Sequence, residues 1–209
     1  MQKTSNSLFA LFILLTGLFM PLQVQAESVT PYSLDELMQA LADNGDSKAR
    51  FTETRNSRLT RKPVESSGVL EFISPDGLVR HISQPREMLF EVRGDKVTIE
   101  RNGKRQTRSL YQLGAAQAFI ESLRGTLAGD QQVLEAFYKL QLNGDLQSWK
   151  LTLSPLEAEL AKKISRIQIK GIILKPTIES KLQQRARVSS IEVHEKNGSI
   201  TRTILEEIR

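Results

Sequence analysis

Cysteine is absent from the 209 residues of this chain. Its absence excludes disulfide bonds, catalysis by a thiol and a lipid attached through a cysteine side chain. A folded form of this sequence must therefore be stabilised by packing and hydrogen bonds, without a covalent cross-link.

Histidine is scarce, and His81 and His194 are the only two. His194 and Glu195 begin the zinc-protease pattern, but Gly198 occupies the position of its second histidine. We therefore expect no metal and no other cofactor. We expect both histidines at exposed strand positions.

The sequence motifs of common catalytic sites are missing as well. No serine lies in a glycine-flanked nucleophile elbow, and the chain has neither a phosphate-binding glycine loop nor a dinucleotide fingerprint. Paired carboxylates such as Glu157 and Glu159 are equally typical of a solvated helix face, because glycosidase chemistry depends on a separation that sequence does not reveal. We expect a binding protein rather than an enzyme, and a hydrolase whose site forms only in three dimensions is the least favoured alternative.

Long apolar runs are missing after the first 26 residues. That opening segment has one charge, Lys3, then an apolar core at Leu8–Met20, and ends in compact residues up to Ala26, which is the layout of a secretion signal. A membrane-spanning helix would need roughly 20 apolar residues. We predict cleavage after Ala26, a periplasmic location, and a single mature domain over residues 27–209 without a membrane span.

The chain also lacks a large excess of either charge, since it has 29 Lys and Arg and 24 Asp and Glu. Four basic residues lie close together, at Arg101, Lys104, Arg105 and Arg108. No aromatic residue interleaves with them and acidic residues are spread over the rest of the chain, so we expect no nucleic-acid partner. The cluster predicts a solvated pair of basic strands, and attraction to anionic lipid head groups stays open.

The first element of the mature region is predicted to be a helix. Ser33 followed by Glu36 forms a capping box. Apolar residues then recur at helical spacing: Leu34, Leu37, Met38 and Leu41. The polar segment from Asp43 to Gly45 ends this helix.

From about residue 50 to residue 109 the sequence alternates as successive strands do. Turn residues separate the strands at 75–77, 94–95 and 102–103, and Asn-Gly at the last of these suits a tight hairpin. We predict an antiparallel meander with one largely polar face. The other face carries Leu70, Phe72, Leu78, Ile82, Phe90, Val92, Val97 and Ile99.

Helices and strands then alternate to the end of the chain. A helical stripe, with Phe119 beside it, consists of Leu113, Ala116, Ile120, Leu123 and Leu127. A short second helix is predicted around residues 133–138, Ser154 with Pro155 predicts another helix start, and residues 175–187 suit either a helix or a long loop. Strands are predicted at 140–142, 149–153, 167–169, 191–193 and 200–204.

These elements predict one α+β domain. An antiparallel sheet that is apolar on one face must bury that face, and the few amphipathic helices are the elements available to cover it. We expect Trp149 to belong to the same core.

The segment from Gly68 to Asn102 carries a resemblance to a known family. A strand, a proline turn, a second strand, a Gln-Pro pair and a third strand follow one another at Gly68, Leu70, Phe72, Pro75, Leu78, His81, Gln84, Pro85 and Val92–Val97. This order and its spacings resemble the LolA family of bacterial periplasmic carriers of outer-membrane lipoproteins, and their lipid-carrier relatives. The order of the flanking elements agrees over nearly the whole mature chain.

The resemblance implies an incomplete, or half, β-barrel whose concave apolar face is covered by helices and receives acyl chains. It also implies partners: the acyl chains of a lipoprotein or lipid, an inner-membrane transporter as donor and an outer-membrane receptor as acceptor. We expect a monomeric carrier that shuttles this cargo between the two membranes and releases it by movement of the helices over the sheet. The alternative is a non-carrying envelope module that uses the same fold to sense lipids or bind a protein.

Nine residues are the candidates for contact with acyl chains. On the helical lid these are Leu37, Met38, Phe119, Ile120 and Leu123, and on the sheet they are Phe72, Phe90, Val92 and Ile99.

Two features depart from the family pattern. Ser74 stands where the family has an arginine that helps to hold the lid closed, and the segment Ile99–Arg101 replaces an aromatic strand. We therefore expect a lid that is less firmly shut than in the family. Another lipid, or another acyl product, fits these departures as cargo equally well.

Overall fold

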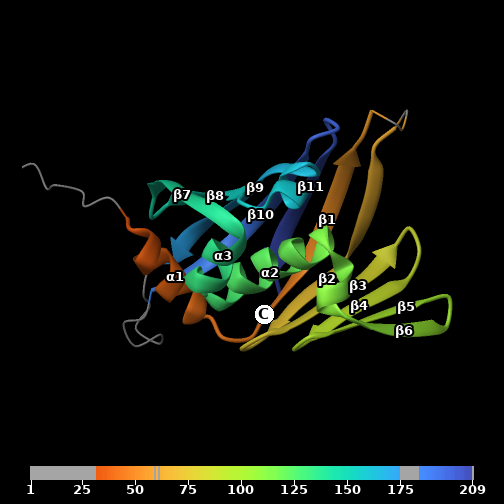
Figure 1. Ribbon diagram of the computed structural model, residues 1–209. Coiled ribbons are helices and arrows are strands. Elements are labelled where there is room, and N and C mark those ends of the chain that lie inside the picture. The colour runs from red at the N-terminus through yellow and green to blue at the C-terminus, as the bar shows by residue number, and fades with distance from the viewer. Residues whose placement is uncertain (1–31, 59, 61, 175–183, 209) are drawn as a thin grey trace, which may run out of the picture. The chain divides into compact units, whose positions relative to one another are not determined.

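The computed structural model in Figure 1 describes residues 32–58, 60, 62–174 and 184–208, all within one compact unit. The predicted secretion signal at residues 1–26, with its cleavage after Ala26, lies outside the described residues. So do residues 175–183, which form most of the segment that suits either a helix or a loop.

Eleven strands form one antiparallel sheet, in the order β6-β5-β4-β3-β2-β1-β11-β10-β9-β8-β7. They are β1 (Ser47–Asn56), β2 (Val64–Ile73), β3 (Gly77–Gln84), β4 (Met88–Arg93), β5 (Lys96–Arg101), β6 (Lys104–Ser109), β7 (Tyr138–Asp145), β8 (Ser148–Pro155), β9 (Ile164–Leu174), β10 (Arg185–Glu195) and β11 (Ile200–Glu207). Among the described strands β6 and β7 are the two edges, so the sheet is open. The predicted α+β fold with an incomplete barrel is confirmed.

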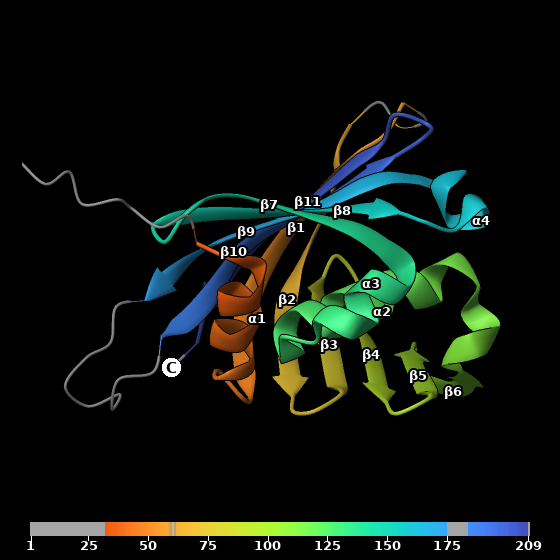
Figure 2. The same cartoon turned by 60° about the vertical axis from the view of Figure 1, so that its left-hand side comes forward.

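The helices lie on one side of this sheet, and Figure 2 shows the sheet curving around the helical layer. They are α1 (Leu34–Ala42), the 3-10 helix η1 (Leu110–Leu113), α2 (Ala115–Ala128), α3 (Gln131–Phe137) and α4 (Ala158–Ala161). Helix α2 packs against α1 and α3, α1 contacts β10, and α3 contacts β7. The helices therefore cover the concave face, as predicted.

The meander places its apolar residues side by side across the strands. Phe72, Leu78, Val92 and Val97 are direct neighbours on β2 to β5, and each is at most 2% exposed. Because side chains two residues apart share a face, this row and the rows beside it form the inner surface of the sheet. Trp149, at 1% exposure, belongs to the same core, as predicted.

Local signals in the sequence set the ends of these elements. The Glu36 backbone N–H donates to Ser33 Oγ at 3.2 Å, and the Ser33 backbone N–H donates to Glu36 Oε2 at 2.8 Å, so the predicted capping box is complete. Asn102 and Gly103 have φ angles of 52° and 70°, as the tight turn between β5 and β6 requires. The basic cluster lies on this hairpin, whose outer strand β6 is a sheet edge, and charged edges discourage pairing with another chain.

Two local predictions are wrong. Pro155 does not begin a helix: β8 continues through it, paired with Tyr138, and the Leu156 backbone N–H donates to the carbonyl of Phe137 at 3.0 Å. Strand pairing therefore outweighs the helix-start signal, and α4 begins only at Ala158. His194 is not an exposed strand residue, because its side chain is only 14% exposed and Nε2 lies 2.6 Å from an oxygen of Glu192.

Candidate functional site

An apolar cavity of about 350 Å³ lies between α2 and the inner face of the sheet. Most of its wall comes from aliphatic and aromatic side chains on both layers. They are Phe51, Leu70, Leu78, Ile82, Met88, Phe90, Ile99, Ile191 and Val193 on the sheet, with Leu113, Ala116, Phe119, Ile120 and Leu123 on the helical side. The cavity falls within the size range of small-molecule and cofactor sites in proteins.

Five of the nine predicted cavity residues line this space. They are Phe90 and Ile99 on the sheet and Phe119, Ile120 and Leu123 on α2. These residues come from segments that are distant in the sequence and that the sheet order brings together under the helix.

The structure does not bring the other four predicted residues to the cavity. Phe72 and Val92 lie one row further along the sheet, where they are at most 2% exposed in the packed core. Leu37 and Met38 are buried on α1, whose main contacts are with α2 and β10. All four are apolar and buried, and Phe72 borders a separate, smaller space of about 60 Å³.

Four polar residues also line the cavity, and the sequence interpretation missed all of them. They are Glu53, Arg80, Thr201 and Thr203. A signal for Arg80 was present, because Leu78, Arg80 and Ile82 alternate on β3 and must point to the same face. The expected apolar face of this strand therefore contains one arginine.

Glu53 and Arg80 form an ion pair in the wall of the cavity. Arg80 Nη2 lies 2.9 Å from Glu53 Oε1, and the Thr203 hydroxyl donates to Glu53 Oε2 at 2.8 Å. The guanidinium also lies over the ring of Phe51, 4.4 Å from its centroid, which is a favourable cation–π arrangement. The two charges stabilise each other where water is restricted, and removing either would leave its partner uncompensated.

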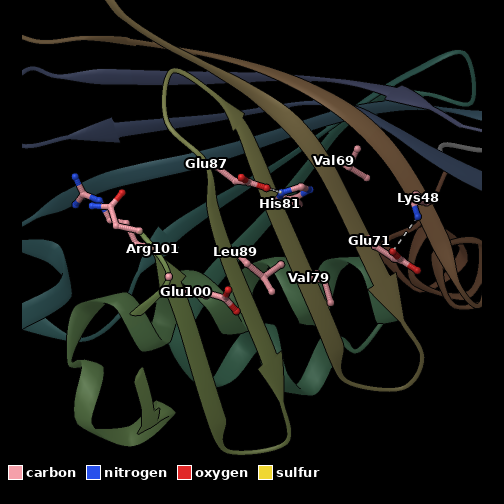
Figure 3. A pocket seen from close by; sticks show the side chains of 11 residues that line it. Lys48, Val69, Glu71, Val79, His81, Glu87, Leu89, Glu100 and Arg101 are labelled. Carbon is pink, nitrogen blue, oxygen red and sulfur yellow. Dashed lines mark hydrogen bonds and ion pairs between the residues drawn. The ribbon is translucent and has the colours of Figure 1, made fainter. Parts of the chain in front are cut away.

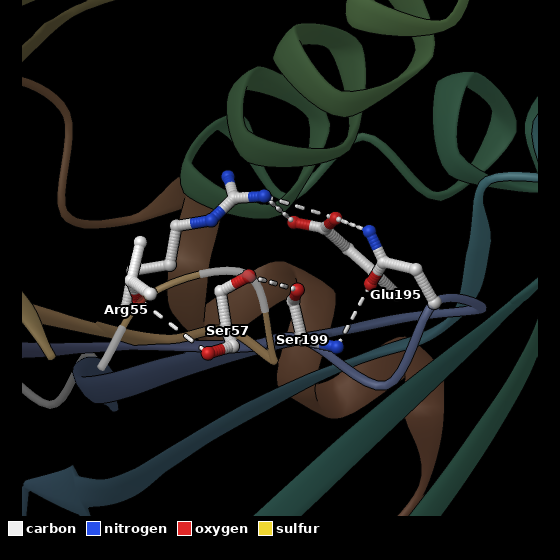
Figure 4. A network of polar contacts seen from close by, with 6 residues as sticks. Arg55, Ser57, Glu195 and Ser199 are labelled. Atoms are coloured by element: carbon white, nitrogen blue, oxygen red, sulfur yellow. Dashed lines mark hydrogen bonds and ion pairs between the residues drawn. The ribbon is translucent and has the colours of Figure 1, made fainter. Parts of the chain in front are cut away.

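A second polar network joins the end of β1 to the turn between β10 and β11 (Figure 4). Arg55 Nη2 lies 2.8 Å from Glu195 Oε1, and the side-chain amide of Asn197 donates to Glu195 Oε2 at 3.1 Å. Ser199 Oγ donates to Ser57 Oγ at 3.2 Å. Arg55 follows Glu53 by two residues, so the concave face becomes more polar toward this end.

Helix α2 is fastened to the sheet by its own arginine. Arg124 Nη2 lies 3.0 Å from Asp76 Oδ2 in the β2–β3 turn, and Nη1 donates to the carbonyl of Gly94 in the β4–β5 turn at 3.2 Å. Nη1 also lies 3.4 Å from Glu121, whose pKa is raised because burial outweighs the nearby positive charge. The helix that covers the cavity is thus held at two turns by one side chain.

A larger hollow, about 650 Å³, lies on the opposite face of the sheet (Figure 3). Val69, Val79 and Leu89 line it, Lys48 forms an ion pair with Glu71, and His81 Nε2 lies within hydrogen-bonding distance of Glu87 Oε1 at 3.1 Å. Figure 3 shows these side chains on the side of the strands away from the helices. None of the described helices covers this face, and its polar rim suits an apolar ligand less well, so the smaller cavity under α2 is the candidate site.

An open antiparallel sheet with a helical lid over an apolar cavity defines a class of protein, the half-barrel binding proteins. The chain belongs to one family of that class, described as outer membrane lipoprotein carrier protein LolA-like, whose model matches residues 26–207. This is a family of carriers rather than enzymes. A search of curated proteins finds no match.

Solved structures of low sequence identity align with most of the chain. A LolA superfamily protein from Nitrosomonas europaea is 10% identical, with a TM-score of 0.46 over 84% of this chain and 91% of the other. A lipoprotein-sorting protein domain from Vibrio parahaemolyticus is 12% identical, with a TM-score of 0.44 and coverage of 84% and 91%. The lipoprotein LppX from Mycobacterium tuberculosis is 12% identical, with a TM-score of 0.37 and coverage of 83% and 92%. Membership of the family rests on the match over residues 26–207.

Within residues 32–58, 60, 62–174 and 184–208, none of the helices has the length and apolar content of a membrane-spanning segment. The same described residues contain no cluster of three or more histidine and carboxylate side chains arranged to bind a metal ion.

Proposed function

We propose that this protein is a periplasmic carrier that binds acyl chains of a lipoprotein or lipid in the cavity under α2. The observation that supports this function most directly is the cavity itself, enclosed between Phe119, Ile120 and Leu123 on the helix and Phe90 and Ile99 on the sheet. An apolar wall of this kind stabilises a bound chain by roughly 0.8 kcal/mol for each methylene group removed from water. The proposed route runs from an inner-membrane transporter to an outer-membrane receptor, without chemistry.

Release of the cargo requires α2 to move away from the sheet. The contacts between α2 and the sheet are mainly apolar and can be broken and remade without chemical change. Arg124 adds ion pairs and a hydrogen bond at two turns, which are reversible as well. We propose that the cavity opens by movement of α2 over β2 to β5, with the signal at residues 1–26 directing the chain to the periplasm.

Charged substitutions in the cavity wall test this function. Phe90→Asp and Ile99→Asp should each weaken binding of a fluorescent fatty-acid probe at least tenfold, because a carboxylate would face the apolar ligand. Leu89→Asp is the matched control, since Leu89 neighbours Phe90 in sequence and lines the hollow on the opposite face. Circular dichroism would show that each variant is folded. Folded cavity variants that bind the probe as well as the parent would contradict the proposed binding surface.

Native mass spectrometry of the protein taken from its own periplasm separates a carrier from a non-carrying module. A carrier should show a lipid or lipopeptide adduct, lost in the Ile99→Asp variant. Repeated absence of an adduct from the parent protein would favour a lipid-sensing or protein-binding module on the same fold.

A further inference from the structure

The polar atoms of the cavity are gathered on one wall. Inward-facing residues on β1 run from Phe51 through Glu53 to Arg55, and thus from apolar to charged. Arg80 reaches Glu53 from β3, and Thr203 lies beside Glu53 on β11. Phe90, the direct neighbour of Arg80 on β4, and Ile99 beside it on β5 add apolar side chains only. A ligand that is apolar along its whole length would offer these polar groups no partner beyond the ones they already have.

Arg80 has hydrogen-bonding capacity left over. A guanidinium carries five N–H donors, and within the described part of the chain its one polar partner is the Glu53 carboxylate, through Nη2. The guanidinium lies over the face of the Phe51 ring, and Arg80 is one of the residues that line the cavity. The ligand that best matches this wall supplies a hydrogen-bond acceptor at the end of an apolar chain.

The volume of the cavity limits the number of chains. A methylene group occupies about as much space as a water molecule, ~30 Å³. A cavity of about 350 Å³ therefore holds about a dozen such groups, which is one acyl chain of moderate length. A second chain of that length would need twice the space.

We propose that the cavity binds a single-chain acyl ester or amide, with its carbonyl oxygen accepting a hydrogen bond from Arg80. This inference rests on the proposed function and names the class of ligand. The acyl tail extends between α2 and the wall formed by Phe90 and Ile99. The head group points along β1 toward Arg55, past the hydroxyls of Thr201 and Thr203.

The charge of the wall favours an uncharged carbonyl over a free fatty-acid carboxylate, so a fatty acid should bind here but more weakly than an ester or amide of the same chain. Arg80 and Glu53 together carry no net charge, and Glu53 Oε1 is only 2.9 Å from the guanidinium. A ligand carboxylate that approached Arg80 would also approach Glu53 and be repelled by it. An ester or amide carbonyl accepts the same hydrogen bond without that repulsion.

Three matched ligands test the proposal by displacement of the neutral dye N-phenyl-1-naphthylamine. Glycerol monolaurate has one chain and an ester carbonyl, and 1-O-dodecylglycerol is its ether analogue without the carbonyl. Glycerol dilaurate has a second chain. The parent protein should bind the monolaurate about tenfold more tightly than the ether, which is the value of one hydrogen bond to a charged group. It should bind the dilaurate at least tenfold more weakly than the monolaurate.

Substitutions then locate the effect at Arg80. The double variant Glu53→Gln with Arg80→Met removes the guanidinium without leaving an unpaired charge, and it should bind ester and ether equally. If the double variant does not fold, Arg80→Lys takes its place. This variant keeps a positive partner for Glu53, and it should reduce the preference for the ester over the ether. The matched control is Glu192→Gln with Arg202→Met, which removes a similar pair from the opposite face and should keep the tenfold preference.

The possible results test the carbonyl contact, the number of chains, the ligand class and the proposed function separately. Equal affinity of the parent for ester and ether, or a preference that survives in both Arg80 variants, overturns the carbonyl contact. Dilaurate binding as tight as monolaurate binding overturns the single-chain proposal. Binding of the dye with no displacement by any of the three ligands overturns the ligand class but leaves the cavity as a binding site. Failure of both dye and ligands to bind overturns the proposed function as well.

Discussion

Single charged residues near the cavity occur with a partner of opposite sign. Arg80 pairs with Glu53 at 2.9 Å, and Arg55 pairs with Glu195 at 2.8 Å. An unpaired charge in such surroundings would be costly, because it loses water and gains nothing in exchange. These pairs allow the protein to place polar atoms beside an apolar cavity without losing the fold.

The outer face contains a pair of this kind whose effect on stability depends on pH. Burial by itself would raise the pKa of Glu192, but hydrogen bonds and charges from Arg202 and His194 outweigh it and lower the pKa below its ordinary value of 4.5. Arg202 Nη2 lies 2.8 Å from Glu192 Oε2. A carboxyl group with a lowered pKa in the folded state stabilises the fold above its unfolded pKa and loses that effect as the pH falls through the folded value.

Glu192→Gln should therefore lower the free energy of unfolding by about 1 kcal/mol at pH 7, where the carboxylate is charged. The difference from the parent should shrink below pH 4.5 and vanish once the parent carboxyl is protonated. Urea denaturation at a series of pH values measures this. A difference that is the same at pH 7 and at pH 3 would show that Glu192 acts by packing rather than by its charge.

Among the elements, α2 contributes both to the stability of the fold and to the binding cavity. It covers the cavity with Phe119, Ile120 and Leu123, and the same helix contacts the sheet turns through Arg124. The sequence interpretation expected a loosely shut lid, because Ser74 replaces the family arginine. That expectation remains a prediction, and the structure adds a contact from the helix to the turns that the interpretation did not include.

Arg124→Met should loosen α2. The change keeps most of the buried apolar stem but removes the contacts to Asp76 and Gly94, and we expect a loss of about 2 kcal/mol in the free energy of unfolding. Amide hydrogens of α2 should exchange faster, and the fluorescent fatty-acid probe should dissociate faster.

Arg93→Met is the control for this lid contact. Arg93 precedes Gly94, pairs with Glu91 at the surface at 2.6 Å and is 58% exposed, so its loss should change little. If exchange in α2 were unchanged in Arg124→Met, the contact between this residue and the turns would have no part in holding the lid.

At the scale of the whole molecule, the cavity and the core belong to one packed layer between helices and sheet. Phe72, Val92 and Val97 are packed in the core, whereas Leu78 beside them and the next row, which contains Phe90 and Ile99, border the cavity. The empty cavity makes the fold less stable than a filled core would, because a cavity wall lacks the dispersion contacts of a filled interior. A bound acyl chain should restore part of that stability.

Binding should therefore raise the melting temperature. A ligand present at 100 times its dissociation constant stabilises the folded state by ~2.7 kcal/mol. For a domain of this size that corresponds to an increase of roughly 5–11 °C. Differential scanning calorimetry with the fluorescent fatty-acid probe measures the shift, and the Ile99→Asp variant should show almost none. An equal shift in both proteins would mean that the ligand binds elsewhere.

The sequence by itself determined the types and order of most elements. The capping box at Ser33, the Asn-Gly turn and the alternation of apolar residues on β2 to β5 are local signals, and local structure follows them because each involves residues close together in the chain. Pro155 shows the limit of this reasoning. Its strand continues because of pairing with Tyr138, which no local signal reports.

The tertiary structure alone decided which inward-facing residues border open space. Phe72 and Phe90 have the same character in the sequence and lie on the same face of neighbouring rows, yet one is packed and the other lines the cavity. The same holds for the polar wall, because Glu53, Arg80 and Thr203 come from three strands far apart in the chain. The difference arises from the position of α2 over the curved sheet, and that position depends on contacts summed over the whole core rather than on any one segment.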